Sequence, residues 1–254
     1  MIDFQTIHHL LSDFEPVNLS EVASVRLMDR IDSKYVTSIS ELTPFLSLLQ
    51  HDFFVQEING NYLSKYFTVY YDTDENDYYR IHQTKKRSRQ KIRVRNYLDT
   101  HTAFVEVKNK NNKGRTKKVR VSCLPDREIR MNQFDEFLSD KSMFPTEHLS
   151  PHVRNTFRRV TLLNKQRTER LTIDVELSFQ NQRTGNSSYL PNICVIELKQ
   201  QGFIHSKAKD ALKTLRIKLN GFSKYCVGCA LTNPAVSQNF IKQKINYINK
   251  LNNQ

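Results

Sequence analysis

The chain has 254 residues, of which 38% are hydrophobic, with 15 Phe and 11 Tyr; this is enough apolar surface for a folded core and excludes an intrinsically disordered chain. It carries 39 Lys and Arg against 26 Asp and Glu, a formal net charge of +13. Such a charge predicts a polyanionic partner: nucleic acid, an anionic membrane surface, a nucleotide or polyphosphate.

The composition also bears on the compartment. No segment approaches the roughly 18 continuous apolar residues of a membrane span, and residues 1–16 lack the apolar run of a signal peptide. The four cysteines are too few for a disulfide framework, which fits a reducing environment. We therefore expect a cytoplasmic protein with no membrane span in this chain.

The first half of the chain mixes helical and extended patterns. Short helices are predicted over residues 1–25, with Ser20 as an N-cap, then an extended segment over 26–37 and an amphipathic helix over 40–49. An aromatic and β-branched run over 62–71 predicts a strand, and the acidic segment 72–77 predicts a turn. Residues 85–121 are predicted to hold three charged strands, two of them joined by an Asn- and Gly-rich hairpin loop over 109–114.

The second half is predicted to begin with a helical insertion over 124–150, whose apolar set is Phe134, Phe137 and Leu138. Strands are then expected over 157–163, 170–179 and 193–199, a basic amphipathic helix over 205–219 and a closing helix over 236–252. The sequence has no Pro/Gly-rich linker and no internal repeat. We expect one α+β domain over 1–254, with the N-terminal helices and the closing helix packed on its sheet.

Five segments alternate ionic and apolar residues at a period of two, which places the two sets on opposite faces of a strand. These segments are 91–95, 105–108, 118–121, 170–176 and 195–199. Two like charges about 6 Å apart at an effective dielectric of about 20 repel by roughly 3 kcal/mol. A sheet face that collects cations therefore predicts an anion held there. Closing the sheet into a barrel would cover its apolar face with helices and leave the ionic side chains inside.

The ionic faces also carry acids. Glu106 alternates with Lys108, Glu197 with Lys199, and Arg170 with Asp174 and Glu176. Arginine and lysine bind phosphate oxygens and carboxylates hold a divalent cation, so this mixture favours a site for phosphate and metal together over a nucleic-acid groove. A purely structural network of ion pairs inside a barrel stays open as the alternative.

Two other features have structural interpretations. Cys226 and Cys229 have the spacing of a metal or redox pair, but no second pair or His cluster accompanies them. Six tyrosines between 62 and 79 could stack on a nucleobase, yet aromatic residues at strand spacing are more often core.

Seven short motifs carry a resemblance to a known family. They are Arg30-Ile-Asp-Ser-Lys34-Tyr35, Ile92-Arg93-Val94-Arg95-Asn96-Tyr97, Glu106-Val-Lys108, Phe157-Arg-Arg159, Arg170-Leu-Thr-Ile-Asp174, Val195-Ile-Glu197-Leu-Lys199 and Phe222-Ser223-Lys224-Tyr225. Their order and spacing resemble the VTC domain, the polyphosphate polymerase domain of the vacuolar transporter chaperone complex, within the triphosphate tunnel metalloenzymes. The resemblance runs from about Arg26 to Gly228, and its specificity comes from the seven motifs in register.

The resemblance implies a closed antiparallel eight-stranded β-tunnel with an ionic interior and helices packed outside. It implies binding of ATP or another triphosphate with Mn²⁺ or Mg²⁺, and transfer of the γ-phosphate to inorganic polyphosphate. Carried over by position, the catalytic residues are the phosphate-binding cations Lys34, Arg93, Arg95, Lys108, Lys118, Arg159 and Lys224. Ser223 is a phosphate-binding hydroxyl and Glu197 the metal ligand. Arg120, Arg170 and Lys199 share the ionic faces as further substrate-binding candidates, and no nucleic acid is expected.

The chain departs from related patterns at four positions. Arg30 and Asp32 stand where the CYTH branch of the tunnel enzymes carries Glu-x-Glu, which favours the VTC branch over a hydrolase with a two-metal acidic floor. Gly221 stands where a lysine is expected and Phe157 where a tyrosine is expected. A tunnel triphosphatase and a non-catalytic polyphosphate-binding module are the alternatives to a polymerase.

Overall fold

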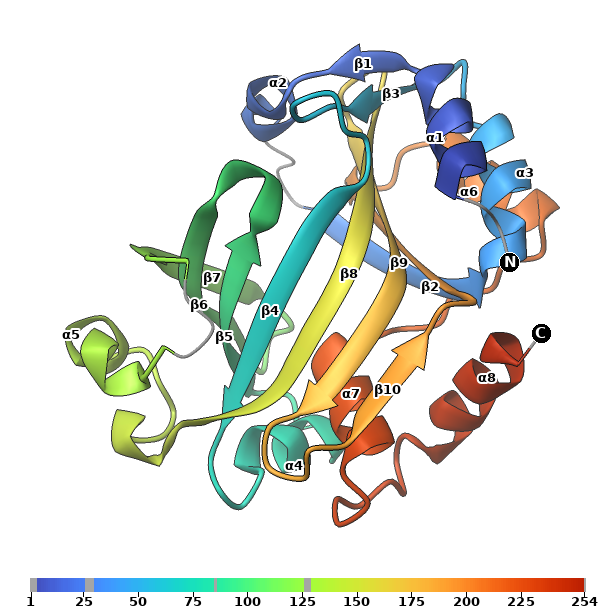
Figure 1. Cartoon of the computed structure of the whole chain (residues 1–254). Helices are drawn as coiled ribbons and strands as arrows, with labels where there is room; N and C mark the ends of the chain where they lie inside the picture. The colour runs from blue at the N-terminus through green and yellow to red at the C-terminus, as the bar shows by residue number, and fades with distance from the viewer. Residues whose placement is uncertain (1–3, 26–29, 85, 126–128, 254) are drawn as a thin grey trace.

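A strongly curled antiparallel sheet forms the centre of the protein (Figure 1). The structure, a computed structural model, describes residues 4–25, 30–84, 86–125 and 129–253, so parts of the predicted segments at 1–25, 26–37, 85–121 and 124–150 lie outside the described residues. Eight strands follow one another in space: β2 (Arg30–Ser38), β11 (Ile193–Gln201), β9 (Glu169–Asn181), β8 (Ser150–Asn164), β4 (Ser64–Asp72), β5 (Arg89–Tyr97), β6 (Thr102–Lys110) and β7 (Thr116–Cys123).

The eight strands form a half-barrel. Within the described residues no ladder of hydrogen bonds joins the two ends of the series, β2 and β7. The α+β class, the eight antiparallel strands and the hairpin between β6 and β7 agree with the sequence-based predictions. Gly114 allows this hairpin to turn, because its φ of 80° lies in the left-handed region that glycine tolerates best.

Three short strands extend the sheet. The parallel pair β1 (Glu15–Val17) and β3 (Phe53–Gln56) is attached through β3 to β8, and β10 (Ser187–Leu190) pairs with β9. None of them was predicted, because three or four residues are too few to show an alternation in the sequence.

Three helices cover one part of the outer face: α1 (Phe4–Ser12), α3 (Leu42–Ser47) and α6 (Lys207–Thr214), which lie on the same side of the sheet in Figure 1. They share a hydrophobic cluster with outward-facing residues such as Ile173, Ile196 and Leu198. Both α3 and α6 are shorter than predicted. A 3₁₀ turn, η1 (Ile39–Glu41), precedes α3, and a left-handed residue, Arg216, follows α6.

The helix α2 (Leu19–Ser24) corrects the predicted N-cap at Ser20. Its cap is Asn18, whose side chain accepts a hydrogen bond from the backbone N–H of Glu21, while the Glu21 carboxylate accepts one from the Asn18 N–H. This reciprocal capping box satisfies two backbone donors at once and starts the helix two residues earlier than predicted.

The predicted turn at 72–77 leads into a helix that was not predicted, α4 (Asp77–Gln83). The buried Asp72 carboxylate accepts hydrogen bonds from the backbone N–H groups of Tyr78 and Tyr79 in its first turn, at 2.8 and 2.9 Å. In its described residues the predicted insertion 124–150 contains only brief helical turns: η3 (Met131–Phe134), α5 (Asp135–Leu138) and η4 (Thr146–His148).

One further unpredicted helix, α7 (Lys224–Thr232), lies against the inner face of the sheet at one end. Its Tyr225 ring packs 5.3 Å from that of Tyr70, which shares the inner face with Arg93. A Cβ at Gly228 would stand 2.7 Å from Phe179, so only glycine allows this approach. Cys226 and Cys229 are free and buried on this helix, in agreement with a structural role.

The closing helix α8 (Lys242–Asn252) begins six residues later than predicted. Its Tyr247 hydroxyl donates a hydrogen bond to the Val36 carbonyl of β2 at 3.1 Å. Among the described residues, no helix has the length and apolar character needed to cross a membrane.

Candidate functional site

The inner face of the half-barrel is ionic, as the period-two pattern predicts. Strand register aligns Lys91, Lys108 and Lys118 in one row across β5, β6 and β7, and Arg93, Glu106 and Arg120 in the next inner-face row. Between these positions Ile92 and Val94 are each only 1% exposed and belong to the core. The alternation in the sequence therefore separates an ionic from an apolar face in β5, β6 and β7.

Strand β9 breaks the alternation once. Glu176 has a φ of 52°, and the register between β8 and β9 shifts at this point. Such a bulge inserts an extra residue and reverses the faces beyond it. Asp174 and its partner Arg159 point to the inner face. Glu176 pairs instead with Arg158, the neighbour of Arg159, which points the other way. The expectation that Glu176 shares the ionic face with Asp174 is therefore wrong.

The first buried carboxylate of the inner face is Glu106, whose side chain is 1% exposed. Its oxygens contact the Arg93 guanidinium at 2.6 Å and the Lys118 ammonium group. Burial alone would raise the pKa of Glu106, but Arg93, Arg95 and Lys118 lower it to about 2. Glu106 therefore stays ionised and orients Arg93 and Lys118, two of the predicted catalytic residues.

The second buried carboxylate, Asp174, ties α7 to the sheet. It accepts hydrogen bonds from Arg159 Nε and Nη2 at 2.5 and 2.8 Å, and it also pairs with the Lys224 ammonium group at the start of α7. Burial would raise the pKa of Asp174, but Arg159 and Lys224 hold it well below its usual range. This bidentate geometry fixes the Arg159 guanidinium in one orientation.

Glu197 is paired more loosely than the other two acids. Its oxygens lie 3.9 Å from Lys34 Nζ and 3.3 Å from Lys199 Nζ, and its side chain is 16% exposed. Burial would raise its pKa, yet Lys34, Lys199 and Arg159 lower that pKa well below the usual value. Glu197 is therefore an ionised carboxylate with room for another partner.

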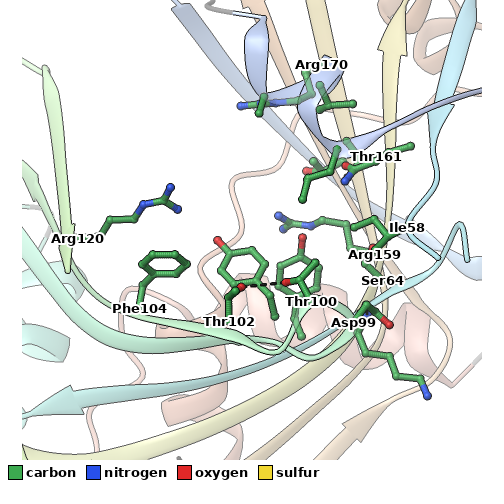
Figure 2. Close-up of a pocket in the computed structure, with 18 of the residues that line it drawn as sticks. Ile58, Ser64, Asp99, Thr100, Thr102, Phe104, Arg120, Arg159, Thr161 and Arg170 are labelled. Carbon is green, nitrogen blue, oxygen red and sulfur yellow. Dashed lines mark hydrogen bonds between the residues drawn. The ribbon is translucent and has the colours of Figure 1, made fainter. Parts of the chain in front are cut away.

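Two cavities open on the inner face. One, of about 540 Å³, is lined by the predicted residues Arg120, Arg159, Arg170 and Lys199. Figure 2 shows the guanidinium groups of Arg120 and Arg159 reaching toward each other from opposite walls of this cavity. The other, of about 570 Å³, is lined by Lys34, Lys108, Glu197 and Ser223, together with Lys91 and Lys244.

Aromatic side chains lie beneath the cations of the first cavity. Tyr66 stacks on Phe157 with ring centroids 4.9 Å apart, and the guanidinium carbons of Arg95 and Arg159 lie 5.6 and 5.0 Å from the Tyr66 centroid. Such cation–π contacts support a guanidinium without neutralising it. Tyr66 therefore contacts two of the predicted site residues. The tyrosines Tyr70, Tyr71, Tyr78 and Tyr79 are buried, in agreement with the core interpretation.

A model of the VTC domain matches residues 29–233. The chain belongs to the VTC domain family. This match confirms the resemblance that the seven motifs carry, and it covers most of the strands described above as well as α7. A comparison with curated proteins found no match.

Solved structures of low identity also resemble this VTC domain. A putative adenylyl cyclase from Hippeastrum, HpAC1, described as revealing a dominant triphosphatase activity, is 12% identical over 81% of this chain and 98% of its own, with a TM-score of 0.48. The PH1819 protein from Pyrococcus horikoshii OT3 is 12% identical over 79% of this chain and 98% of its own, with a TM-score of 0.42.

The VTC domain brings all twelve predicted site residues to the inner face or to the first turn of α7. Eight of them line the two cavities; Arg93, Arg95, Lys118 and Lys224 lie on the same face in contacts with Glu106, Thr68 or Asp174. Lys91 and Lys244 line the second cavity but were not among the predicted site residues. The alternation in β5 could have indicated Lys91 as a site residue, whereas nothing in the sequence of α8 indicates Lys244.

Proposed function

We propose that this VTC domain, acting as one unit over residues 1–254, is a metal-dependent polyphosphate polymerase that transfers the γ-phosphate of ATP to inorganic polyphosphate. The observation that carries the proposal is the convergence of the predicted bases on one concave face. Lys34, Arg93, Lys108 and Arg159 come from four strands, β2, β5, β6 and β8, and share that face. Membership of the VTC domain family is the reason for proposing polyphosphate synthesis as the reaction.

The chemistry of phosphoryl transfer suits this arrangement. The transition state is loose, so catalysis depends on holding the attacking and leaving oxygens in line and on neutralising charge around the phosphorus. Arg93 and Arg159 are held by carboxylates in one orientation each, so they are organised before the substrate arrives. The attacking group is the end of the phosphate chain, and the protein needs to supply no nucleophile.

The residues present fit a divalent cation that is shared with the substrate. Within the described residues no group of three or more His, Cys, Asp or Glu side chains is placed to hold a metal by itself. Mg²⁺ commonly takes only one or two carboxylates and completes its shell with water and substrate phosphates. Glu197, loosely paired at the edge of the second cavity, would be the protein ligand for Mn²⁺ or Mg²⁺. The bound cation would offset negative charge on the phosphate oxygens.

We also propose that the substrate completes the tunnel. Strand β2 is one end of the strand series and β6 is next to the other end, yet Lys34 on β2 and Lys108 on β6 both line the second cavity. Burial, together with the positive charge of Lys34, lowers the pKa of Lys108 to about 8. A phosphate chain lying between the two strands would replace this repulsion with attraction on both sides.

The test is incubation of the purified protein with ATP and Mn²⁺, followed by gel electrophoresis of the products. A ladder of polyphosphate together with ADP is the expected result. Release of ADP and free phosphate without a ladder would instead identify a triphosphatase. Strong thermal stabilisation by tripolyphosphate without any turnover would identify a binding module, because a ligand that binds only the folded state stabilises it.

Anion binding should weaken as the pH rises above 8. Burial lowers the pKa of Lys91, Lys108, Lys199 and Lys224 to about 8, so these lysines lose charge in the free protein between about pH 7 and 9. We expect the affinity for tripolyphosphate, measured by calorimetry, to fall more than about tenfold between pH 7 and 9.5, since several ion pairs with the anion are lost.

The stability of the free protein should change in the opposite direction. These four lysines have lower pKa values in the folded chain than the ordinary value of 10.5, so the unfolded chain binds more protons between about pH 8 and 10. Their contribution to the free energy of unfolding therefore rises over this window. A tripolyphosphate affinity that does not change between pH 7 and 9.5 would contradict the proposal that these lysines bind the anion.

A further inference from the structure

Three lysines from three different elements converge on three consecutive residues. Lys244 of α8 donates a hydrogen bond to the Gly221 carbonyl. Lys34 of β2 donates to the Phe222 carbonyl at 3.3 Å, and Lys91 of β5 donates to the Ser223 hydroxyl at 2.9 Å. The segment 221–223 thus gathers three ammonium groups at the start of α7.

The three ammonium groups face a cavity with a large excess of positive charge. Among the described residues, this second cavity is lined by six cations, Lys34, Arg89, Lys91, Lys108, Lys110 and Lys244, and by two carboxylates, Asp32 and Glu197. His82 also lines it, but burial lowers its pKa to about 3, so this ring is neutral. The acceptors at 221–223 are two carbonyls and a hydroxyl, so these hydrogen bonds do not neutralise the ammonium charges. Lys34 also lies 3.9 Å from a Glu197 oxygen.

The position of Lys244 is set by the packing of α8. Ile241, Ile245 and Ile248 are buried at 6% exposure or less, and the Tyr247 hydroxyl bonds to β2. Lys244 therefore lines the cavity from a helix that is fixed by these contacts. Lys242 and Lys250 lie on the same helix but do not line the cavity, and they are exposed.

We propose that Lys244 is a substrate-binding residue, which forms with Lys34 and Lys91 a lysine triad for one phosphate group of an inorganic oligophosphate or polyphosphate chain. In the free protein the acceptors at 221–223 hold the three ammonium groups; the phosphate oxygens replace these acceptors on binding. The proposal rests on the phosphate-chain function proposed above. It extends the site to α8, which lies beyond the segment 29–233 that matches the family.

The test compares Lys244→Gln with Lys242→Gln by calorimetric titration of tripolyphosphate without ATP or metal. Both variants lose one positive charge from α8, so they share any general electrostatic effect. Lys244→Gln should weaken binding about tenfold, the size expected for one charge-assisted hydrogen bond, and Lys242→Gln less than about twofold. Lys244→Arg should retain most of the affinity because it keeps the charge and can still donate hydrogen bonds.

A second measurement uses the unaltered protein and does not depend on how any variant folds. Brief acetylation followed by mass spectrometry reports which amines react, and tripolyphosphate should protect Lys244 severalfold while Lys242 and Lys250 react as before. Equal weakening by Lys244→Gln and Lys242→Gln, or no protection of Lys244, would overturn the triad. Failure of the unaltered protein to bind tripolyphosphate would overturn this inference and the proposed function together, whereas binding that ignores Lys244 overturns the inference alone.

Discussion

Replacing Glu197 by glutamine is expected to reduce ATP turnover by on the order of 100-fold or more, the scale seen when one preorganised charged or polar group is removed from a catalytic site. Glutamine keeps the shape of the side chain but removes the negative charge that would hold the divalent cation. Binding of tripolyphosphate without metal should persist or strengthen, because the variant loses an acid from a cationic cavity. Product formation at saturating Mn²⁺ and calorimetry without metal measure the two effects.

Glu176→Gln is the matched control for this prediction. Glu176 lies on the same sheet, but the bulge in β9 leaves it paired with Arg158 instead of with the cations of the inner face. Its replacement should leave turnover within about twofold, as usual for a substitution away from the site. A Glu197→Gln enzyme that keeps most of its turnover would remove Glu197 from the metal site. Equal losses in both variants would trace the effect to the sheet and not to the site.

Replacing Asp174 by asparagine is expected to have the largest effect on stability. Asp174 is only 4% exposed in its side chain and pairs with both Arg159 and Lys224. Its neutralisation leaves two buried cations without their acid, and breaking a buried ion pair from one side typically costs about 3–5 kcal/mol. At about 2–4 °C per kcal/mol for a chain of this size, the unfolding midpoint should fall by about 10 °C.

The same variant should respond more strongly to anions than the unaltered protein. Tripolyphosphate would supply negative charge next to Arg159 and Lys224, so it should recover part of the lost stability in thermal unfolding. Asp140→Asn is the control, since the Asp140 side chain is 74% exposed and pairs only at the surface with Lys141. A loss below about 1 kcal/mol for Asp174→Asn would show that the pairing of Asp174 is not needed to hold α7 on the sheet.

Local periodicity was sufficient to predict the strands of the site and the face on which their ionic residues lie. In β5, Lys91, Arg93 and Arg95 share one face because alternate side chains of a strand must point the same way. The same argument holds for β6, β7 and β11, and the register of seven motifs was enough to identify the family. The sequence alone therefore determined the ionic chemistry of the wall and most of the strand residues that form it.

Packing over long sequence separations decided the rest. The bulge at Glu176 moves one predicted acid off the inner face, and no alternation in the sequence marks where a strand takes an extra residue. The start of α7 is placed by Asp174, 50 residues earlier in the chain, and Lys244 reaches Gly221 only because α8 docks on β2. A strand pattern specifies a face, but the partners that meet across the concave side depend on how the sheet curls and on which helices fill its ends.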